Sequence, residues 1–548
     1  MKLKYITASL LSAALFMFTG CVGDLDVFPL DPNVVTSNVA YSDADSYTKG
    51  LNKIYSVWAI SGQDGAGSSD ISGLDPGNTV FLRCWWTLQE NTTDEAKCAW
   101  GNDSWVSSIN GLTWSTTIIE PIEGAYQRAM YIVALANDFM KNIPNAPAGV
   151  NKEQYSAEAR FCRALAYYTL MDFFGRPPFI TEDNYSLAPS QLSRADLFNW
   201  IEGELTAIHD VLPMKAVYGR AGQAAVDALL ARMYLNAEVY TGTNRYTDCI
   251  TRCKNVISAG YQLADNYAEL FMADNGENAK ANKEIIFPII ADGDVTQSYG
   301  IGAIILGSRS QGEAETHTAA GINGGWDGFR STGNLVRSFD FSNSDESTWT
   351  AANILDKRGI FRSNNRSIDI TTSALNTFAA EGWSVFKYTN MKSDGTPGKN
   401  NTFPDTDFPF FRLGEVYLTY AEAVARGGQG GDAATAIGYI NELRDRGFGN
   451  ANHHINESWL TATAIVGGTN ASVQYGNILN ERAREMYWEA TRRTDLIRFG
   501  LFTTNTYTWA EKGGIITGVG VGSHYALFPI PTSDMGVNGS LTQNEGYK

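Results

Sequence analysis

The sequence predicts a mainly α-helical protein, with a scaffold of paired helices from which two large loop-rich excursions project. Two observations lead to this fold class. Several long stretches repeat apolar residues at intervals of three and four, which is the period of a helix buried on one face. Between them lie segments rich in Gly, Ser, Asn and Thr that are too long to be simple connections in a compact domain.

The predicted helices follow one another through most of the chain. The second of them runs into the sequence GRPP, where a glycine and two prolines end a helix. The helices carry alanines among tyrosines and leucines, a composition that allows close packing and is typical of tetratricopeptide-like hairpins. We expect helices at residues 126–140, 155–174, 223–240, 246–258, 411–425, 432–446 and 476–499.

The loop-rich excursions lie at about residues 61–118 and 262–404. Irregular segments of this size usually pack on a rigid scaffold and carry binding residues. We therefore expect one domain over residues 21–548, in which the helices give the shape and the excursions carry the function.

The first twenty residues are interpreted as a lipoprotein signal peptide. Lys2 and Lys4 precede an apolar run at 6–18, which is too short to span a bilayer as a helix. The run leads into FTGC, so Cys21 would become the lipidated first residue of the mature protein. The alternative is an ordinary secretory signal with an incidental cysteine.

Composition and charge narrow the classes of function. The chain has 548 residues, 44% of them hydrophobic and 18% charged, which indicates a globular protein. Its formal net charge of −17 repels nucleic acid and anionic lipid, so neither is expected as a ligand, and the membrane is expected to be reached only through the lipid. The few, unevenly spaced cysteines and histidines fit neither a disulfide framework nor a zinc site.

Five stretches, in this order along the chain, carry a resemblance to a known family. The chain resembles the SusD-like (RagB/SusD) outer-membrane glycan-binding lipoproteins of Bacteroidetes over essentially all of residues 21–548, and within them the starch-binding members. The stretches are the lipoprotein start, RFCRALAYYTLMDFFGRPPF, FPFFRLGEVYLTYAEAVAR, ERAREMYWEATRRTDLIRFG and YALFPIPTSDMGVNGSLTQNEGYK.

The resemblance implies a location, a ligand and a partner. The protein would sit on the cell surface, held in the outer membrane by the lipid on Cys21. It would bind starch or malto-oligosaccharide and deliver it to a SusC-like TonB-dependent transporter, without cleaving it and with no required cofactor. Two departures from the starch binders, Cys98 in place of a tryptophan and Asp103 in place of an asparagine, leave a related oligosaccharide open as the ligand.

The resemblance also implies an arc of aromatic rings that stack on the apolar faces of sugars, with polar side chains that bind the hydroxyl groups. The three rings all lie in Gly-, Ser- and Asn-rich sequence, as an exposed platform needs. The rings are Trp100, Trp326 and Tyr299, and the polar residues are Arg83, Asp103 and Asp75.

Other tryptophans near this arc are expected in the core. Trp85, Trp86 and Trp105 lie in the same short region as Trp100, and a tryptophan in such a region more often covers a core than binds a ligand.

Two acidic loops predict a possible structural calcium site. Asp274, Glu277 and Asn278 lie in ADNGEN, and Asp405 and Asp407 lie in PDTD. Together they could supply the oxygen ligands that calcium prefers. Solvated acidic turns are an equal alternative.

Two other functions remain open from the residues. A glycoside hydrolase would need two carboxylates beside the rings, and Asp103 and Asp75 are the nearest candidates. Glu485 and Glu489 are a less suitable pair, because the arginines around them would lower both pKa values and leave no general acid. The third possibility is a scaffold that binds peptides or proteins, as tetratricopeptide folds often do.

Overall fold

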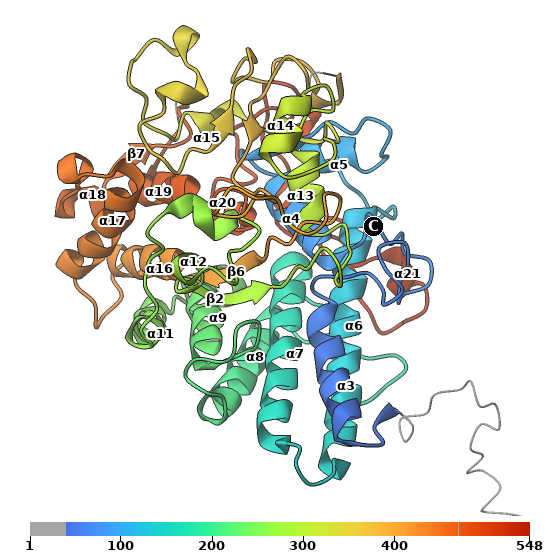
Figure 1. The fold of residues 1–548 in the computed structure, drawn as a ribbon. Coiled ribbons are helices and arrows are strands. Elements are labelled where there is room, and N and C mark those ends of the chain that lie inside the picture. The colour runs from blue at the N-terminus through green and yellow to red at the C-terminus, as the bar shows by residue number, and fades with distance from the viewer. Residues whose placement is uncertain (1–39, 377, 470, 548) are drawn as a thin grey trace, which may run out of the picture.

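The computed structural model describes residues 40–376, 378–469 and 471–547 (Figure 1). The predicted signal peptide and Cys21 lie outside these residues. No helix in the described ranges is long and apolar enough to cross a membrane.

Helices dominate the structure, which confirms the predicted fold class. The longer ones are α3 (Ala44–Ser56), α6 (Glu120–Asn142), α7 (Lys152–Phe174), α8 (Arg194–Ile208), α9 (Gln223–Leu235), α11 (Tyr246–Ser258), α16 (Leu413–Ala425), α17 (Ala433–Phe448) and α19 (Gly476–Met486). The shorter ones are α4 (Phe81–Glu90), α5 (Val106–Gly111), α10 (Ala237–Thr241), α12 (Ala279–Asn282), α13 (Ile301–Gly307), α14 (Ala314–Ala319), α15 (Gly333–Val336), α18 (Glu457–Thr461), α20 (Arg492–Arg498) and α21 (Thr532–Met535).

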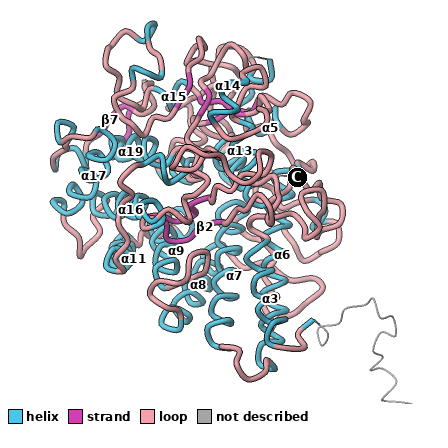
Figure 2. The backbone as a smooth tube through the Cα atoms, viewed as in Figure 1, coloured by secondary structure: helices cyan, strands magenta, loops and turns pink. Residues whose placement is uncertain are grey.

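Consecutive long helices pack against one another. α7 lies between α6 and α8, α9 packs on α11, and α16 packs on α17 and α11. Figure 2 shows this helical half, with the loop-rich chain gathered on one side of it. The arrangement agrees with the predicted hairpins, although their tetratricopeptide-like character stays a prediction.

Most predicted helix boundaries are close to the observed ones, and α11 matches its prediction at both ends. The main difference is at 476–499, where the structure has two helices instead of one. The chain between α19 and α20 holds Trp488 and Ala490 in left-handed backbone conformations, at φ 62° and 58°. An α-helix cannot continue through such residues.

The excursion at 61–118 is less irregular than predicted, because it contains α4. All ten residues of this helix are buried. Trp85 and Trp86 lie on it, and these two rings and Trp105 are each no more than 3% exposed. The prediction that these three tryptophans belong to the core is confirmed.

In the described residues, the strands form four antiparallel pairs. They are β1 (Ala96–Cys98) with β3 (Phe329–Ser331), β2 (Ile285–Ile289) with β6 (Phe408–Arg412), β4 (Phe361–Arg362) with β5 (Ser384–Val385), and β7 (Thr463–Ile465) with β8 (Ser472–Gln474). The β1–β3 pair joins the two excursions, with Cys98 opposite Phe329.

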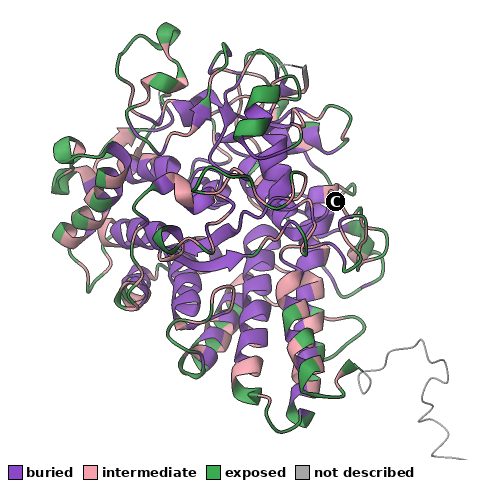
Figure 3. Ribbon diagram, viewed as in Figure 1, coloured by how far each residue is buried: buried purple, intermediate pink, exposed green. Residues whose placement is uncertain are grey.

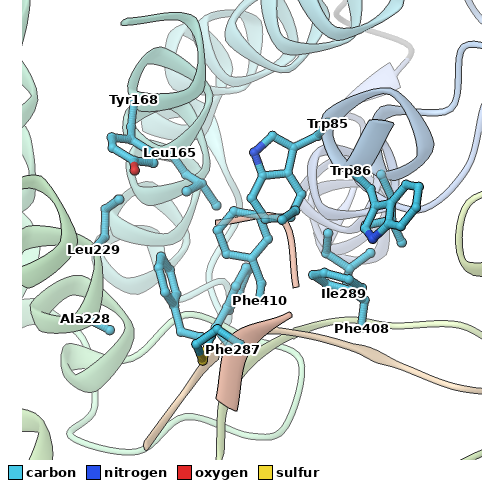
Figure 4. Close-up of a cluster of buried hydrophobic side chains, with 14 of the residues drawn as sticks. Trp85, Trp86, Leu165, Tyr168, Ala228, Leu229, Phe287, Ile289, Phe408 and Phe410 are labelled. Atoms are coloured by element: carbon cyan, nitrogen blue, oxygen red, sulfur yellow. The ribbon is translucent and has the colours of Figure 1, made fainter. Parts of the chain in front are cut away.

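The hydrophobic core joins the helices to the β2–β6 pair (Figure 4). The ring of Trp85 stacks on Phe410 with centroids 4.5 Å apart. Trp86 donates its indole N–H to the Trp488 carbonyl at 3.0 Å. Figure 3 shows the buried residues running through the helices into the loop-rich half, so one core supports both parts.

A cluster of buried ion pairs lies beside this core. Arg412, at the end of β6, contacts Glu485 at 2.6 Å and Glu489 at 2.6 Å, and all three side chains are almost completely buried. Arg358 contacts the other oxygen of Glu485 at 3.0 Å. We call the whole set the buried ion cluster; it comprises Glu284, Arg358, Lys387, Arg412, Arg446, Glu481, Glu485 and Glu489.

Glu485 is not suited to act as a general acid. Burial by itself raises the pKa of Glu485, but the guanidinium groups of Arg446, Arg412 and Arg358 outweigh burial and hold that pKa well below its ordinary value. Glu485 therefore stays ionised and unable to donate a proton. For Glu485, this agrees with the prediction that the surrounding arginines leave it without a general-acid role.

We expect Arg412→Met to destabilise the fold strongly. The substitution leaves the carboxylates of Glu284, Glu485 and Glu489 short of a partner in the core, and breaking a buried pair costs about 3–5 kcal/mol. Denaturant unfolding of the two proteins measures the difference.

The matched control is Lys49→Ala in α3. Lys49 pairs with Asp45 at 2.7 Å on the surface, where ion pairs contribute little. We expect no measurable change from it. Equal stabilities of the Arg412→Met and Lys49→Ala variants would contradict this account of the cluster.

Candidate functional site

Three half-buried rings predicted as a binding platform lie side by side in the structure. Trp100 follows β1, Trp326 precedes β3, and Tyr299 precedes α13. The β1–β3 pair therefore holds the first two rings next to each other across the two excursions.

Trp326 is the middle ring of this arc. Its centroid lies 6.4 Å from that of Trp100, and the two ring planes are inclined by 51°. Tyr299 lies 5.8 Å away on the other side, inclined by 54°. The indole N–H of Trp100 donates to the Trp326 carbonyl at 2.7 Å, which fixes the position of both residues.

Gly328 allows the Trp100 ring to lie close against the neighbouring loop. A Cβ on Gly328 would lie 2.3 Å from the Trp100 ring. The preceding residue, Asp327, has a left-handed backbone at φ 52° and accepts a hydrogen bond from the Gln311 amide at 2.8 Å. The loop is thus held in one conformation by its own contacts.

Arg83 forms the base of the site. It lies on α4, its guanidinium carbon is 5.1 Å from the centroid of the Trp100 ring, and it donates to the Gly77 carbonyl at 3.0 Å. Burial lowers the pKa of Arg83, and the nearby carboxylates of Asp103 and Asp75 oppose that effect. The positive charge is therefore close to both predicted acidic residues.

The two acidic residues have different surroundings. Asp103 faces the site, and burial raises the pKa of its carboxyl, against the effect of Arg83. Asp75 lies at the rim, where its carboxylate accepts the Gly77 amide at 2.9 Å and the Asn78 amide at 2.6 Å. Asp75 thus shapes a turn beside the site and is absent from the pocket wall.

The rings, Arg83 and Asp103 surround an open pocket of about 660 Å³. Its wall also includes Asn102 and Asp327, which the sequence analysis did not single out. Asn102 is next to Asp103 in the sequence, and Asp327 is next to Trp326. Their places beside predicted residues in polar loops could have identified them. A pocket with flat apolar surfaces and separate polar groups suits a ligand that has apolar faces and a rim of hydroxyl groups.

Three of the five residues of the predicted calcium site lie together in the structure. Glu277, Asp405 and Asp407 line a second pocket of about 210 Å³. Asp405 accepts the Gly293 amide at 2.7 Å, and Asp407 accepts the Tyr218 hydroxyl at 2.9 Å. Burial raises the pKa of Asp407 to about 7.

The side chains of the other two predicted ligands, Asp274 and Asn278, bind backbone amides. Asp274 accepts the Ser393 amide at 2.9 Å, and Asn278 accepts the Lys280 amide at 3.0 Å at the start of α12. Within the described part of the chain, no group of three or more His, Cys, Asp or Glu side chains is arranged to hold a metal ion. Calcium stays a prediction.

Comparison with known proteins identifies the family. A model of the SusD family matches residues 227–547, which is more than half of the chain. The chain belongs to the SusD family. A second model, described as "Starch-binding associating with outer membrane", matches residues 86–235. The two matches together cover residues 86–547, which include all three rings of the pocket but neither α3 nor Arg83.

Individual SusD-family proteins are similar over long stretches. The chain is 36% identical to the starch-binding protein SusD of Bacteroides thetaiotaomicron, over 100% of both chains. It is 24% identical to the SusD-like protein P25 of Formosa agariphila, over 76% of this chain and 78% of that one.

Solved structures share the SusD-family fold. A SusD-like protein of Bacteroides fragilis aligns with a TM-score of 0.68 at 19% identity, over 95% of this chain and 100% of that one. The surface glycan-binding protein A of Bacteroides thetaiotaomicron, solved with laminarihexaose, aligns with a TM-score of 0.67 at 18% identity, over 91% and 99%.

We expect Gly328→Ala to displace the Trp100 ring of this SusD-family protein, because the new methyl group would overlap it. Gly324→Ala is the matched control in the same loop, since no atom lies within 4 Å of its added Cβ. Crystal structures of the two variants measure the ring position. A Trp100 ring in its original place in Gly328→Ala would contradict this role of the glycine.

Proposed function

We propose that the protein is a cell-surface lipoprotein that binds starch or malto-oligosaccharides and passes them to a SusC-like TonB-dependent transporter. The observation that carries the proposal is the arc of Trp100, Trp326 and Tyr299 around an open pocket. The 36% identity to a protein named as starch-binding, over both full lengths, supports the choice of ligand.

The pocket offers the two kinds of contact that a sugar needs. The rings can stack on the C–H faces of glucose units, while Arg83 can donate to hydroxyl oxygens and Asp103 can accept from hydroxyl groups. Three stacked rings with a few exposed hydrogen bonds leave a net binding free energy of about 4–6 kcal/mol, or roughly millimolar to tens of micromolar affinity. Such weak binding suits a protein that hands its ligand on.

Binding without cleavage fits the acidic residues near the rings. Glycosidic cleavage by the common mechanisms needs two carboxylates that flank the bond. Asp103 lines the pocket, but the carboxylate of Asp75 is engaged by two backbone amides at the rim. Asp327 also lines the pocket, and its carboxylate accepts the Gln311 amide at 2.8 Å. Because backbone amides engage both Asp75 and Asp327, the site supports a binding role over a hydrolytic one.

We expect Trp100→Ala to weaken maltoheptaose binding at least tenfold, because losing one stacked ring costs ~1.5 kcal/mol or more. Isothermal titration calorimetry measures the affinity. Trp459→Ala, at a half-buried tryptophan on α18 that does not line the pocket, is the control and should leave the affinity unchanged.

The same preparation separates binding from the alternatives. Laminarihexaose serves as the competing ligand. If the protein binds it more tightly than maltoheptaose, the proposal that the ligand is a malto-oligosaccharide is wrong. Overnight incubation with a labelled malto-oligosaccharide tests hydrolysis, and sugars released by the wild type would refute the non-catalytic proposal.

The proposal also includes a lipid anchor on Cys21 and a transporter as the binding partner. Cys21 follows the apolar run of the signal sequence, and one lipidated residue with several acyl chains would hold the protein on the membrane. We expect Cys21→Ala to shift the protein from the membrane fraction to the soluble fraction. Co-purification of the wild-type lipoprotein with a SusC-like transporter tests the partner. If no transporter co-purifies in mild detergent, the proposed partnership is contradicted.

A further inference from the structure

A separate hollow of about 400 Å³ lies beside α6, opposite the loop that contains Ile71 and the segment around α21. Figure 1 shows α21 close to the upper part of α6, although the two are far apart in the sequence. We call this hollow the α6 pocket; it is lined by Tyr126, Gln127, Met130, Tyr131, Asp534 and Val537, among others.

The α6 pocket combines the same two kinds of surface as the first pocket. Tyr131 and Met130 are half-buried and give it an apolar wall, and Val537 is 82% exposed at its edge. Gln127 and Asp534 supply polar groups at the same place. The α6 pocket therefore offers an apolar wall and polar groups at one place.

The polar groups of the α6 pocket are held in place by one another. Tyr126 donates its hydroxyl hydrogen to Asp534, and Gln127 and Ser533 both donate to Glu123. The two carboxylates disfavour an anionic ligand, and Asp534, which lines the pocket, can accept from hydroxyl groups with its remaining lone pairs. The chemistry therefore fits a neutral ligand that is rich in hydroxyl groups.

One helix connects the two pockets. Glu120, the first residue of α6, accepts a hydrogen bond from Asn78 at 3.1 Å at the rim of the first pocket. Burial raises the pKa of Glu120, and the Asp75 and Asp103 carboxylates close to it raise that pKa further. Gln127 lies two turns along the same helix, ~10 Å from Glu120 along the axis.

We propose that the α6 pocket is a second subsite for the same glycan chain, which would leave the first pocket past Glu120 and continue along α6. Residues four and seven apart share a helix face, so the half-buried residues Glu120, Gln127 and Tyr131 lie along one face of α6 between the two pockets. In this arrangement the Tyr131 ring contacts a sugar face and Gln127 contacts a hydroxyl group. This inference rests on the proposed glycan-binding function.

The test compares a short ligand with a long one. Maltotriose would be held by the first pocket alone, whereas amylopectin would reach both pockets. We expect Tyr131→Ala, and separately Gln127→Ala, to leave the maltotriose affinity unchanged and to weaken amylopectin binding about five- to tenfold, which corresponds to ~1–1.4 kcal/mol. Isothermal titration and affinity electrophoresis measure the two ligands, and melting temperatures confirm that each variant folds.

Two controls make the result specific. Tyr185→Ala removes a tyrosine that is 66% exposed outside both pockets, and it should change neither affinity. Trp100→Ala should weaken both ligands. If the wild type binds no sugar at all, the proposed function fails; if Trp100→Ala alone weakens binding while Tyr131→Ala and Gln127→Ala do not, only the second subsite is refuted.

A direct readout comes from Met130. Its methyl resonance, labelled with ¹³C and assigned with the Met130→Leu variant, should shift on addition of amylopectin fragments and remain unchanged with maltotriose. An unchanged resonance at saturating concentrations of the long ligand would overturn the proposal.

Discussion

Arg412 and Glu485 meet at 2.6 Å in the centre of the protein, where neither side chain has contact with water. An isolated charge in this position would be very unfavourable, so each must find a partner of opposite sign in good geometry. Glu284, Arg358 and Lys387 bring charges from the large excursion to the same place. The excursion can therefore dock on α17 and α19 in one arrangement only, and the position of its loops follows from that arrangement.

Two strand pairs connect the buried ion cluster to the residues of the binding pocket. The β2–β6 pair ends at Arg412, and the chain that leaves β2 reaches Tyr299 ten residues later. The β1–β3 pair sets Trp100 beside Trp326. Because the rings are fixed before a ligand arrives, little conformational entropy is lost on binding, and even a few weak contacts give measurable affinity.

The ring arc was predicted because the family resemblance gave Trp100, Trp326 and Tyr299 a role; the Gly-, Ser- and Asn-rich sequence around them fits an exposed platform but did not identify it. The turn-forming role of Asp75 was missed, although the sequence DPGN is typical of a turn in which the aspartate carboxylate accepts the backbone amides two and three residues later. The α6 pocket could not be predicted, because α6 and α21 are brought together only by the folded chain.

The break between α19 and α20 shows a second limit of sequence patterns. The stretch from 476 to 499 keeps a helical period and contains glycine only at its first residue and no proline, so nothing local stops the helix. The structure turns the chain at Trp488, whose ring packs against Trp86 at 5.1 Å and whose indole N–H donates to the Glu95 carbonyl. Tertiary contacts outweigh local helix propensity there.

The inclination of the rings bears on the shape of the ligand. The planes of Trp100 and Tyr299 are inclined by 51° and 54° to that of Trp326, so the platform is not flat. A straight, ribbon-like glycan presents parallel faces and would stack on one of these rings at a time. An α-linked glucan curves, and its successive sugar units change orientation along the chain. Because the indole N–H of Trp100 is already bound to the Trp326 carbonyl, that ring offers a ligand only its face.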